Sequence, residues 1–531
     1  MINIIEVILG LLAAVAGLAL LGRRLRVPLP ILLVIGGLML GLIPGLPRVA
    51  LDPELVFVFF LPPLLYPAAL FTSWRDFRAN LRPILLLAVG LVLFTTASVG
   101  FLAHYFIQDL PLTAGFVLGA IISPPDAIAA TAIAERLRVP RRIVTILEGE
   151  SLVNDATALV AYRFALAALV TGSFSLGSAT GHFFVVGLGG ILIGLIVGWL
   201  AAVIQKPIDD PPIEITLSLL TPFAAYLPAE QLGVSGVLAV VTAGLYHGWR
   251  IPEITTSRTR LQAGPVWEMI EFLLNGFIFI LIGLQLPEVL RHLAGRSISQ
   301  LVWYAVLISL AVILIRILWV FPASYLPRLL FKRIRQRDPY PAWQHVAVVA
   351  WTGMRGVVSL AAALAVPLTM RDGSPFPGRD LILFLTFIVI LATLVVQGLS
   401  LPPIIRWLGI EDDRAAEKEE RAARLKANQA ALARLSEIAK SQSMNADTLQ
   451  RLRAEYQDRI RQLEVCEPSD TEVPHGLFSS DYEQLSHETL QVERKTILQL
   501  RNERVINDEV LRHIQRDIDL AEARLGQPNR A

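Results

Sequence analysis

The segment GESLVNDATALVAYRF, residues 149–164, places charged and polar side chains inside an apolar stretch of the chain. An ionisable side chain within a membrane span costs at least about 2.5 to 3.5 kcal/mol on insertion scales, so such residues are candidates for function. On a helix, Ser151 and Asp155 lie four residues apart and share a face, and Glu150 and Asn154 form a neighbouring pair with the same spacing. A carboxylate, a hydroxyl and an amide that converge from one helix offer hard oxygen ligands. The segment therefore predicts a site for a small hard cation or a proton.

The composition is that of a protein with many membrane spans. The chain has 531 residues, of which 54% are hydrophobic and 17% are charged, and its mean hydropathy is +0.57. Cutting the apolar runs at their polar breaks gives about thirteen segments long enough to cross a bilayer. The first run is interpreted as a retained span, because it has no basic region before it and no clear small-residue cleavage site.

Charge divides the chain into two parts and predicts its orientation. Residues 1–410 are expected to form the transmembrane domain, and residues 411–531, with 19 Lys/Arg and 24 Asp/Glu, a charged helical tail. Basic residues collect in one set of alternate loops, so the positive-inside rule places the N-terminus outside and the tail in the cytoplasm. The single cysteine, Cys466, excludes an intrachain disulfide. The tail could be a partner surface, a regulatory module or a solvated helical appendage.

Two of the expected spans are predicted to be broken. In the fifth, residues 112–135, two adjacent prolines precede Asp126 at mid-depth, and each proline removes a backbone donor and clashes with the preceding turn. The twelfth, residues 345–368, has two glycines and Arg355 at the same depth. The two spans are seven apart, so one would be inverted relative to the other. Paired interrupted spans in inverted repeats indicate the mid-membrane site of a secondary transporter.

Four motifs carry a resemblance to a known family. LPPLLYPAALF, SPPDAIAATA, GESLVNDATAL and WTGMRGVVSLA, in this order over about the first 410 residues, resemble the NhaP-type sodium/proton antiporters, which include the eukaryotic sodium/hydrogen exchangers. The closing segment VINDEVLRHIQRDIDLAEARL is similar to the tail of the bacterial branch. The resemblance implies an all-α polytopic membrane protein with about thirteen transmembrane helices, arranged as two inverted six-helix repeats with broken crossing helices.

The same resemblance implies an activity and a setting. A core domain would move against a dimerising domain in a homodimer within the inner (plasma) membrane, and exchange a monovalent cation, first Na⁺, for H⁺. The expected partners are monovalent cations, protons and the lipid bilayer, with no nucleic acid and no cofactor. The chain is not expected to be an enzyme.

The resemblance also assigns roles to individual residues. The family's ion-binding carboxylate falls on Asp155, with Ser151 and Asp126 nearby, so these three would hold the transported metal cation.

The supporting positions follow from the same motifs. The family's structural ion pair falls on Glu150 with Arg355, and Asn154 sits beside that pair. Arg316, which lies three-quarters of the way along its span, is expected to extend its guanidinium towards the membrane surface.

The chain departs from the family pattern near the expected site. Pro125 stands where relatives often have threonine, and Pro67 where many have an acidic residue, so fewer oxygen ligands remain. This leaves K⁺ or Li⁺ as alternatives to Na⁺. Asn154, in place of a second aspartate, predicts about one cation per proton and near-electroneutral exchange. Glu148 is a further carboxylate whose role the pattern leaves open.

The same residues also allow other interpretations of the site and of the protein class. Asp155 could pair with Arg163, eight residues on, and Asp126 could cap the helix that follows the prolines. An ion channel would need a symmetric filter, which no repeat in the chain suggests. An intramembrane aspartyl protease could use Asp126 and Asp155, although Arg355 and the broken pair of spans favour transport. No phosphate loop, metal-ligand cluster or Ser-His-Asp arrangement occurs, so nothing indicates ATP-driven transport.

Overall fold

The computed structural model describes nine stretches of the chain and eight isolated positions. These are residues 2–25, 28–43, 56–108, 110–171, 176–293, 295–370, 374–410, 415–441 and 446–465, with 490, 492, 493, 495, 503, 517, 518 and 520. They belong to two units, Met1–Asp413 and Arg414–Ala531. Cys466, the proline-containing break after Val465 and nearly all of the closing segment 505–525 lie outside the described residues.

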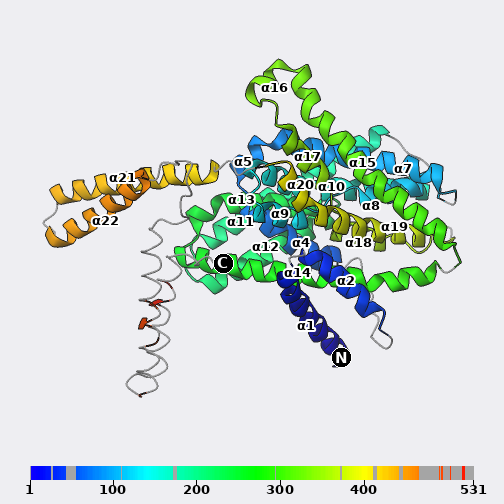
Figure 1. Ribbon diagram of the computed structural model, residues 1–531, viewed down its shortest axis with the longest axis horizontal. Coiled ribbons are helices and arrows are strands. Elements are labelled where there is room, and N and C mark those ends of the chain that lie inside the picture. Colours follow the sequence, from blue (N-terminus) through cyan, green and yellow to red (C-terminus); the bar gives the residue numbers. More distant parts are fainter. Residues whose placement is uncertain are drawn as a thin grey trace. The chain divides into compact units, whose positions relative to one another are not determined.

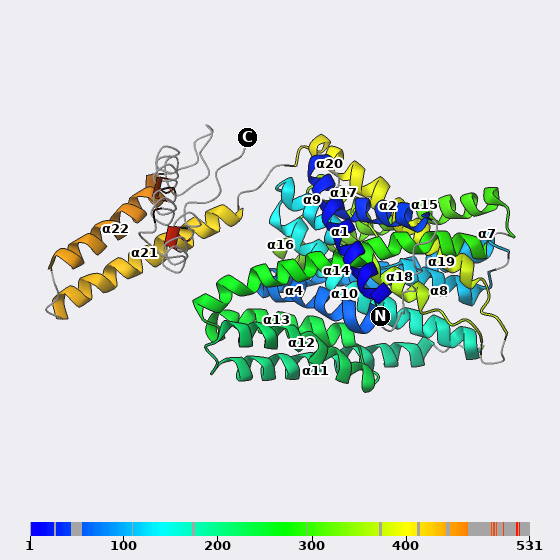
Figure 2. The ribbon, with the colours of Figure 1, turned by 90° about the horizontal axis from the view of Figure 1, so that it is seen from below.

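The first unit is built from helices, as the sequence predicts for an all-α polytopic protein (Figures 1 and 2). In the described stretches, the only pairing of β type is an isolated bridge between Thr369 and Pro375. Six helical segments are long and apolar enough to cross a membrane, and shorter apolar helices accompany them. The chain is therefore an integral, multi-pass membrane protein. The six segments are Leu81–Phe106, Arg141–Val170, Thr180–Gln205, Arg258–Pro287, Ile298–Leu330 and Arg379–Trp407.

The helices follow one another with short connections, and three short π-helical turns (η) interrupt the α-helical order. The first part contains α1 (Ile2–Leu25), α2 (Leu29–Gly41), η1 (Val56–Phe60), α4 (Leu61–Phe71), α5 (Trp74–Ala79), α6 (Leu81–Leu85), η2 (Leu86–Leu91), α7 (Val92–Phe106), α8 (Leu112–Ile122), α9 (Ile128–Arg136) and α10 (Arg141–Thr171). The second contains α11 (Leu176–Gln205), α12 (Pro211–Gln231), α13 (Gly236–Ile254), α14 (Ser257–His292), α15 (Ile298–Leu330), α16 (Lys332–Arg337), α17 (Trp343–Trp351), α18 (Val357–Leu364), α19 (Arg379–Ala392), η3 (Thr393–Gln397) and α20 (Gly398–Trp407). The second unit holds α21 (Ala415–Ser441) and α22 (Ala446–Val465).

Helices α11, α12 and α13 lie side by side and form one layer of the first unit (Figure 2). The sequence of α11 explains its contact with α13, because glycines recur every four residues and so fall on one face. A side chain at Gly190 or Gly194 would collide with the backbone carbonyl oxygens of Ser235 or Ala239 on α13. Small residues of this kind let membrane helices approach closely where apolar burial alone gives little preference for a neighbour.

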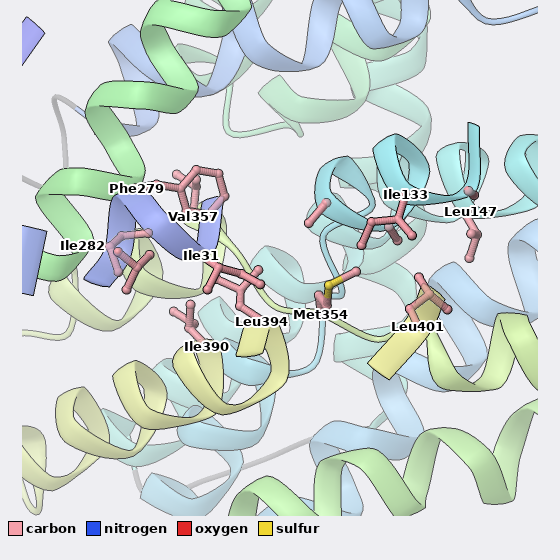
Figure 3. Close-up of a cluster of buried hydrophobic side chains, with 14 of the residues drawn as sticks. Ile31, Ile133, Leu147, Phe279, Ile282, Met354, Val357, Ile390, Leu394 and Leu401 are labelled. Atoms are coloured by element: carbon pink, nitrogen blue, oxygen red, sulfur yellow. The ribbon is translucent and has the colours of Figure 1, made fainter. Parts of the chain in front are cut away.

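A large apolar core holds several helices of the first unit together (Figure 3). It joins α2 and α14 to α9, α10 and the region from Met354 to α20. Burying a large apolar side chain contributes roughly 1.5–3 kcal/mol relative to exposure, so this core fixes the elements that flank the candidate site. Its labelled members in Figure 3 are Ile31, Ile133, Leu147, Phe279, Ile282, Met354, Val357, Ile390, Leu394 and Leu401.

Three arginines from different helices converge on Asp338, in the connection between α16 and α17. Its carboxylate oxygens lie 2.6 Å from Arg82 Nη2, 2.7 Å from Arg142 Nη2 and 2.7 Å from Arg328 Nη2. Partial burial of the carboxyl raises its pKa, but the hydrogen bonds and charges of Arg142 and Arg328 outweigh burial, so the pKa stays below the ordinary value. This cluster ties the starts of α6 and α10 to the end of α15.

Candidate functional site

The two interrupted spans meet at their breaks, which confirms the prediction that both are broken. Helix α8 ends at Ile122 and α9 begins at Ile128, while α17 ends at Trp351 and α18 begins at Val357. The backbone N–H of Asp126 donates to the carbonyl oxygen of Met354 at 2.7 Å. Four helix ends therefore face one another in the interior of the first unit.

Arg355 donates hydrogen bonds to the carbonyl end of α8 and to the unwound segment that follows α17. Its Nε donates to the carbonyl oxygen of Ile122 at 3.0 Å, and its Nη1 donates to that of Gly353. Arg355 is 1% exposed. A helix carries partial negative charge at its C-terminal end, so a buried guanidinium placed there is favourable. Arg355 is thus held by the end of α8 and by the unwound segment between α17 and α18.

Asp126 serves the start of α9, where backbone N–H groups are free. Its Oδ1 accepts a hydrogen bond from the N–H of Ile128 at 2.9 Å. Its Oδ2 lies directly against Gly356, where any side chain would collide with it. The alternative role of Asp126 as a helix cap is therefore confirmed. The collision also explains why position 356 is a glycine.

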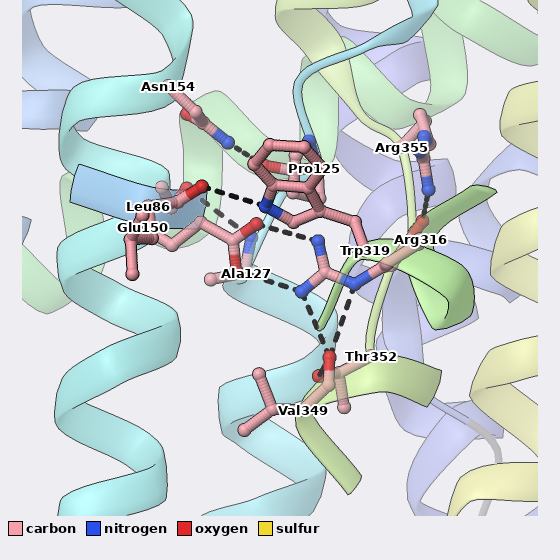
Figure 4. A network of polar contacts seen from close by, with 12 residues as sticks. Leu86, Pro125, Ala127, Glu150, Asn154, Arg316, Trp319, Val349, Thr352 and Arg355 are labelled. Carbon is pink, nitrogen blue, oxygen red and sulfur yellow. Dashed lines mark hydrogen bonds and ion pairs between the residues drawn. The ribbon is translucent and has the colours of Figure 1, made fainter. Parts of the chain in front are cut away.

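Helix α10 runs beside the break and holds it through two polar side chains (Figure 4). Asn154 donates from Nδ2 to the carbonyl oxygen of Pro125 at 2.6 Å, while its own Oδ1 is buried without a partner in the described part of the chain. Ser151 Oγ accepts a hydrogen bond from the N–H of Ala127 at 3.4 Å. The four-residue spacings seen in the sequence thus bring a hydroxyl and an amide to the unwound segment.

Asp155 is a buried carboxylate without a counter-charge in the described part of the chain. The residue is 7% exposed, and Asp126 is the charged side chain that acts on it electrostatically. Arg163 pairs with Glu230 at 2.6 Å, so the expectation of a possible Asp155–Arg163 pair is wrong. Among the described residues no ion pair reaches the Asp155 carboxylate. A buried charge in this position favours binding a cation or a proton.

Glu150 pairs with Arg316, so the expected ion pair with Arg355 is wrong. Arg316 Nη1 and Nη2 lie 2.6 and 2.8 Å from the two carboxylate oxygens of Glu150, and the two side chains are 0% and 2% exposed. Arg316 also donates from Nε and Nη2 to the carbonyl oxygen of Val349, at 3.2 and 3.0 Å (Figure 4). The planar guanidinium matches a carboxylate in this two-point geometry.

Both arginines have partners that differ from the expected ones. Arg355 donates hydrogen bonds to carbonyl oxygens at the two breaks, and Arg316 points into the bundle from the middle of α15 instead of reaching the membrane surface. A charge that lies well inside an apolar run is itself a sign of a buried partner. That signal was present in the sequence at Arg316, and the interpretation as a surface-seeking side chain missed it.

Glu148 lies apart from the meeting point of the broken spans. It precedes Asp155 by seven residues on the same face of α10, about 10 Å along the axis. It is partly buried, and its charged neighbours are Glu135 and Arg141. Within the described residues no three His, Cys, Asp or Glu side chains form a group that could hold a metal ion.

Crossed, interrupted helices around a buried carboxylate are the arrangement of a secondary transporter. The chain belongs to the sodium/hydrogen exchanger family, because the family model described as "Sodium/hydrogen exchanger, transmembrane" matches residues 10–407. The resemblance drawn from the four motifs is thereby confirmed. The family is one of transporters, so the chain is not an enzyme, and the alternative of an aspartyl protease is wrong.

Relatives and solved structures agree with this assignment. An uncharacterized Na⁺/H⁺ exchanger of Mycobacterium tuberculosis is 39% identical over 98% of this chain and 96% of that protein. The sodium, potassium, lithium and rubidium/H⁺ antiporter of Bacillus subtilis is 36% identical over 75% of this chain and 61% of its own length. The sodium proton antiporter MjNhaP1 of Methanocaldococcus jannaschii at pH 8 has the same fold, with a TM-score of 0.61, 21% identity, and coverage of 76% of this chain and 99% of that one.

Proposed function

We propose that this protein exchanges a monovalent cation, first of all Na⁺, for protons across the cell membrane, with Asp155 as the group that both occupants bind. Residues 1–410 would carry the exchange through about thirteen spans in two inverted repeats. Residues 411–531 would form a cytoplasmic tail, the N-terminus would lie outside, and two chains would form a homodimer. The observation that carries the proposal is the buried, uncompensated Asp155 carboxylate beside two broken spans.

The mechanism is competition for one carboxylate. Deprotonated Asp155 binds a cation, and protonated Asp155 needs none, so each occupant displaces the other. An empty, charged carboxylate opposes movement through a dry barrier because desolvating it is costly. Only the two occupied forms then cross readily between the two sides of the membrane, and alternating access converts this into exchange.

The backbone carbonyl oxygens at the breaks are already hydrogen-bonded, which favours binding of the cation by side-chain carboxylates. The carbonyl oxygens of Ile122, Pro125, Gly353 and Met354 already accept hydrogen bonds from protein groups. In other transporters such carbonyls can hold the ion. Here the ligands would be the Asp155 carboxylate with oxygen atoms of Ser151 and Asp126, and water would complete the shell.

Asn154, Glu150, Pro125 and Arg355 would support this site without binding the ion. Asn154 holds the Pro125 carbonyl and so fixes the unwound segment beside Asp155. Glu150 pairs with Arg316, and Arg355 donates hydrogen bonds to the carbonyl oxygens of Ile122 and Gly353. Both charged side chains therefore already have protein partners.

The choice among cations can be tested by flux. In everted vesicles or proteoliposomes, adding the transported cation should dissipate an imposed proton gradient with saturable kinetics. We expect Na⁺ to be effective, and a scan over Na⁺, K⁺, Li⁺ and pH decides whether K⁺ and Li⁺ are too. The broad cation names of relatives such as the Bacillus subtilis antiporter make K⁺ and Li⁺ the second candidates. Proton movement that no cation drives, or a rapid current that does not saturate, would contradict exchange.

Exchange of one cation for one proton should also be insensitive to voltage. Moving one elementary charge through 100 mV is worth about 2.3 kcal/mol, so even a partly uncompensated charge would give a steep dependence. We expect the proton flux to stay nearly constant when the potential is clamped with an ionophore for an ion that the cation scan has excluded as a substrate. The reason is that Asn154 stands where a second aspartate would carry another charge. A steep voltage dependence would contradict the one-for-one ratio and direct attention to Glu148.

A further inference from the structure

A second polar network joins α4 to the layer formed by α11, α12 and α13, and none of its members belongs to the group around Asp155. Tyr66 Oη, from α4, lies 2.5 Å from His247 Nδ1, and His247 Nε2 lies 2.8 Å from Gln205 Oε1. Gln205 Nε2 donates to the backbone carbonyl oxygen of Glu214 at 3.4 Å. Tyr66, His247, Gln205 and Glu214 are at most 2% exposed.

If Tyr66, His247 and Gln205 are all neutral, each hydrogen bond of this network has only one assignment of donor and acceptor. Gln205 Oε1 can only accept, so His247 Nε2 must donate to it. His247 Nδ1 can then accept from the Tyr66 hydroxyl, and the amide of Gln205 donates to the Glu214 carbonyl. In this neutral form the network supplies no positive charge to its neighbour Glu214.

The carboxylate of Glu214 is incompletely satisfied. Its Oε1 accepts a hydrogen bond from Thr259 Oγ1 at 2.9 Å. Its Oε2 is sealed from solvent and has no partner among the described residues. Glu214 lies in the first turn of α12, where the helix dipole favours negative charge but does not neutralise it. A buried carboxylate in this state requires a proton or a cation.

Glu214 is one of the residues that line a cavity of about 540 Å³. Its lining includes Glu214, Gln205 and His247, with the hydroxyl-bearing residues Ser218 and Thr259. A water molecule occupies about 30 Å³ in the liquid, so the space admits a cation with several waters. Two arginines, Arg75 and Arg260, also line it, and both are exposed side chains at its rim.

We propose that Glu214 binds a monovalent cation in this cavity, at a site separate from Asp155. The ligands would be the Glu214 carboxylate, the hydroxyl groups of Ser218 and Thr259, and water, all of them hard oxygen donors. Glu214 lies between the end of α11, which carries Gln205, and the start of α14, which carries Thr259. A cation bound there would join these helix ends and stabilise the layer.

Thermal unfolding of the purified full-length chain tests the proposal without relying on transport. The protein would be measured in NaCl, KCl and choline chloride at constant ionic strength, in an Asp155→Asn background that removes the proposed transport site. We expect Tm to rise with Na⁺ or K⁺ and to saturate, because a ligand that binds only the folded state stabilises it. Adding Glu214→Gln should abolish this rise.

Two further variants keep the test decisive. Glu253→Gln removes an exposed carboxylate near the same helix ends, where it pairs with Arg250, and should leave the rise of Tm unchanged. Thr259→Val keeps the charge and should raise the cation concentration needed for half of the effect, which covers the case that Glu214→Gln does not fold.

The opposing outcomes are equally specific. No cation-dependent rise in the Asp155→Asn protein, or a rise that survives Glu214→Gln, overturns the proposal. A Tm that changes with pH but not with cation would show that Glu214 holds a proton instead, which also overturns it. Cation-driven flux in the unmodified protein tests the antiport proposal independently, so failure of one proposal does not imply failure of the other.

Discussion

Asp155→Asn is expected to abolish cation-driven proton movement, down to the level of protein-free liposomes, while the chain still folds. An amide has nearly the shape of the carboxylate but can neither exchange a proton nor neutralise a cation. Asp155 makes no ion pair with the described residues, so its loss breaks no structural contact of that kind. The folded state should therefore retain its packing.

The measurement is proton flux in proteoliposomes, with unfolding and chromatographic behaviour recorded for the same preparation. Asp380→Asn is the matched control, since Asp380 is a half-exposed aspartate at the start of α19, and it should exchange at the normal rate. Robust cation-dependent flux by a well-folded Asp155→Asn protein would show that the exchanged proton resides elsewhere.

Removing either member of the Glu150–Arg316 pair should destabilise the folded protein by about 3–5 kcal/mol, because the remaining charge is left buried and unpaired. Both Glu150→Gln and Arg316→Met keep similar side-chain volume. The double variant should recover much of the loss, since no uncompensated charge remains. A double-mutant cycle on unfolding free energies would report this coupling directly.

The same cycle run with Arg355 gives the control. Arg355 donates to the carbonyl oxygens of Ile122 and Gly353 and has no bond with Glu150. The coupling between Glu150→Gln and Arg355→Met should therefore be much smaller than that between Glu150→Gln and Arg316→Met. Equal coupling, or strictly additive losses for Glu150 and Arg316, would contradict the pairing in the structure.

Local signals in the sequence predicted the parts of the site that depend on the backbone. The prolines before Asp126 and the glycines around Arg355 break their helices for reasons contained within a few residues. The four-residue spacing along α10 placed Ser151 and Asn154 on neighbouring faces, and both contact the break. Periodicity within one span is enough for such inferences.

Contacts between distant spans could not be predicted in this way. Glu150 and Arg316 are 166 residues apart, and Tyr66 and His247 are 181 apart. Two arginines in apolar runs were available for Glu150, and only the packing of α15 against α10 decides between them. The pattern within a span shows that a charge is buried, but it does not show which helix faces it.

The crossed breaks hold each other by reciprocal bonds. The N–H of Asp126 donates to Met354, the guanidinium of Arg355 donates back to Ile122, and Asn154 fastens Pro125 to α10. These hydrogen bonds hold the residues around Asp155 together as one rigid group. If this group moves as a unit during transport, its internal geometry stays the same, and the cation is bound with the same intrinsic affinity on the two sides of the membrane. Differences in turnover would then arise where α10 packs against α4 and α13, so variants at this contact should alter turnover while leaving cation affinity unchanged.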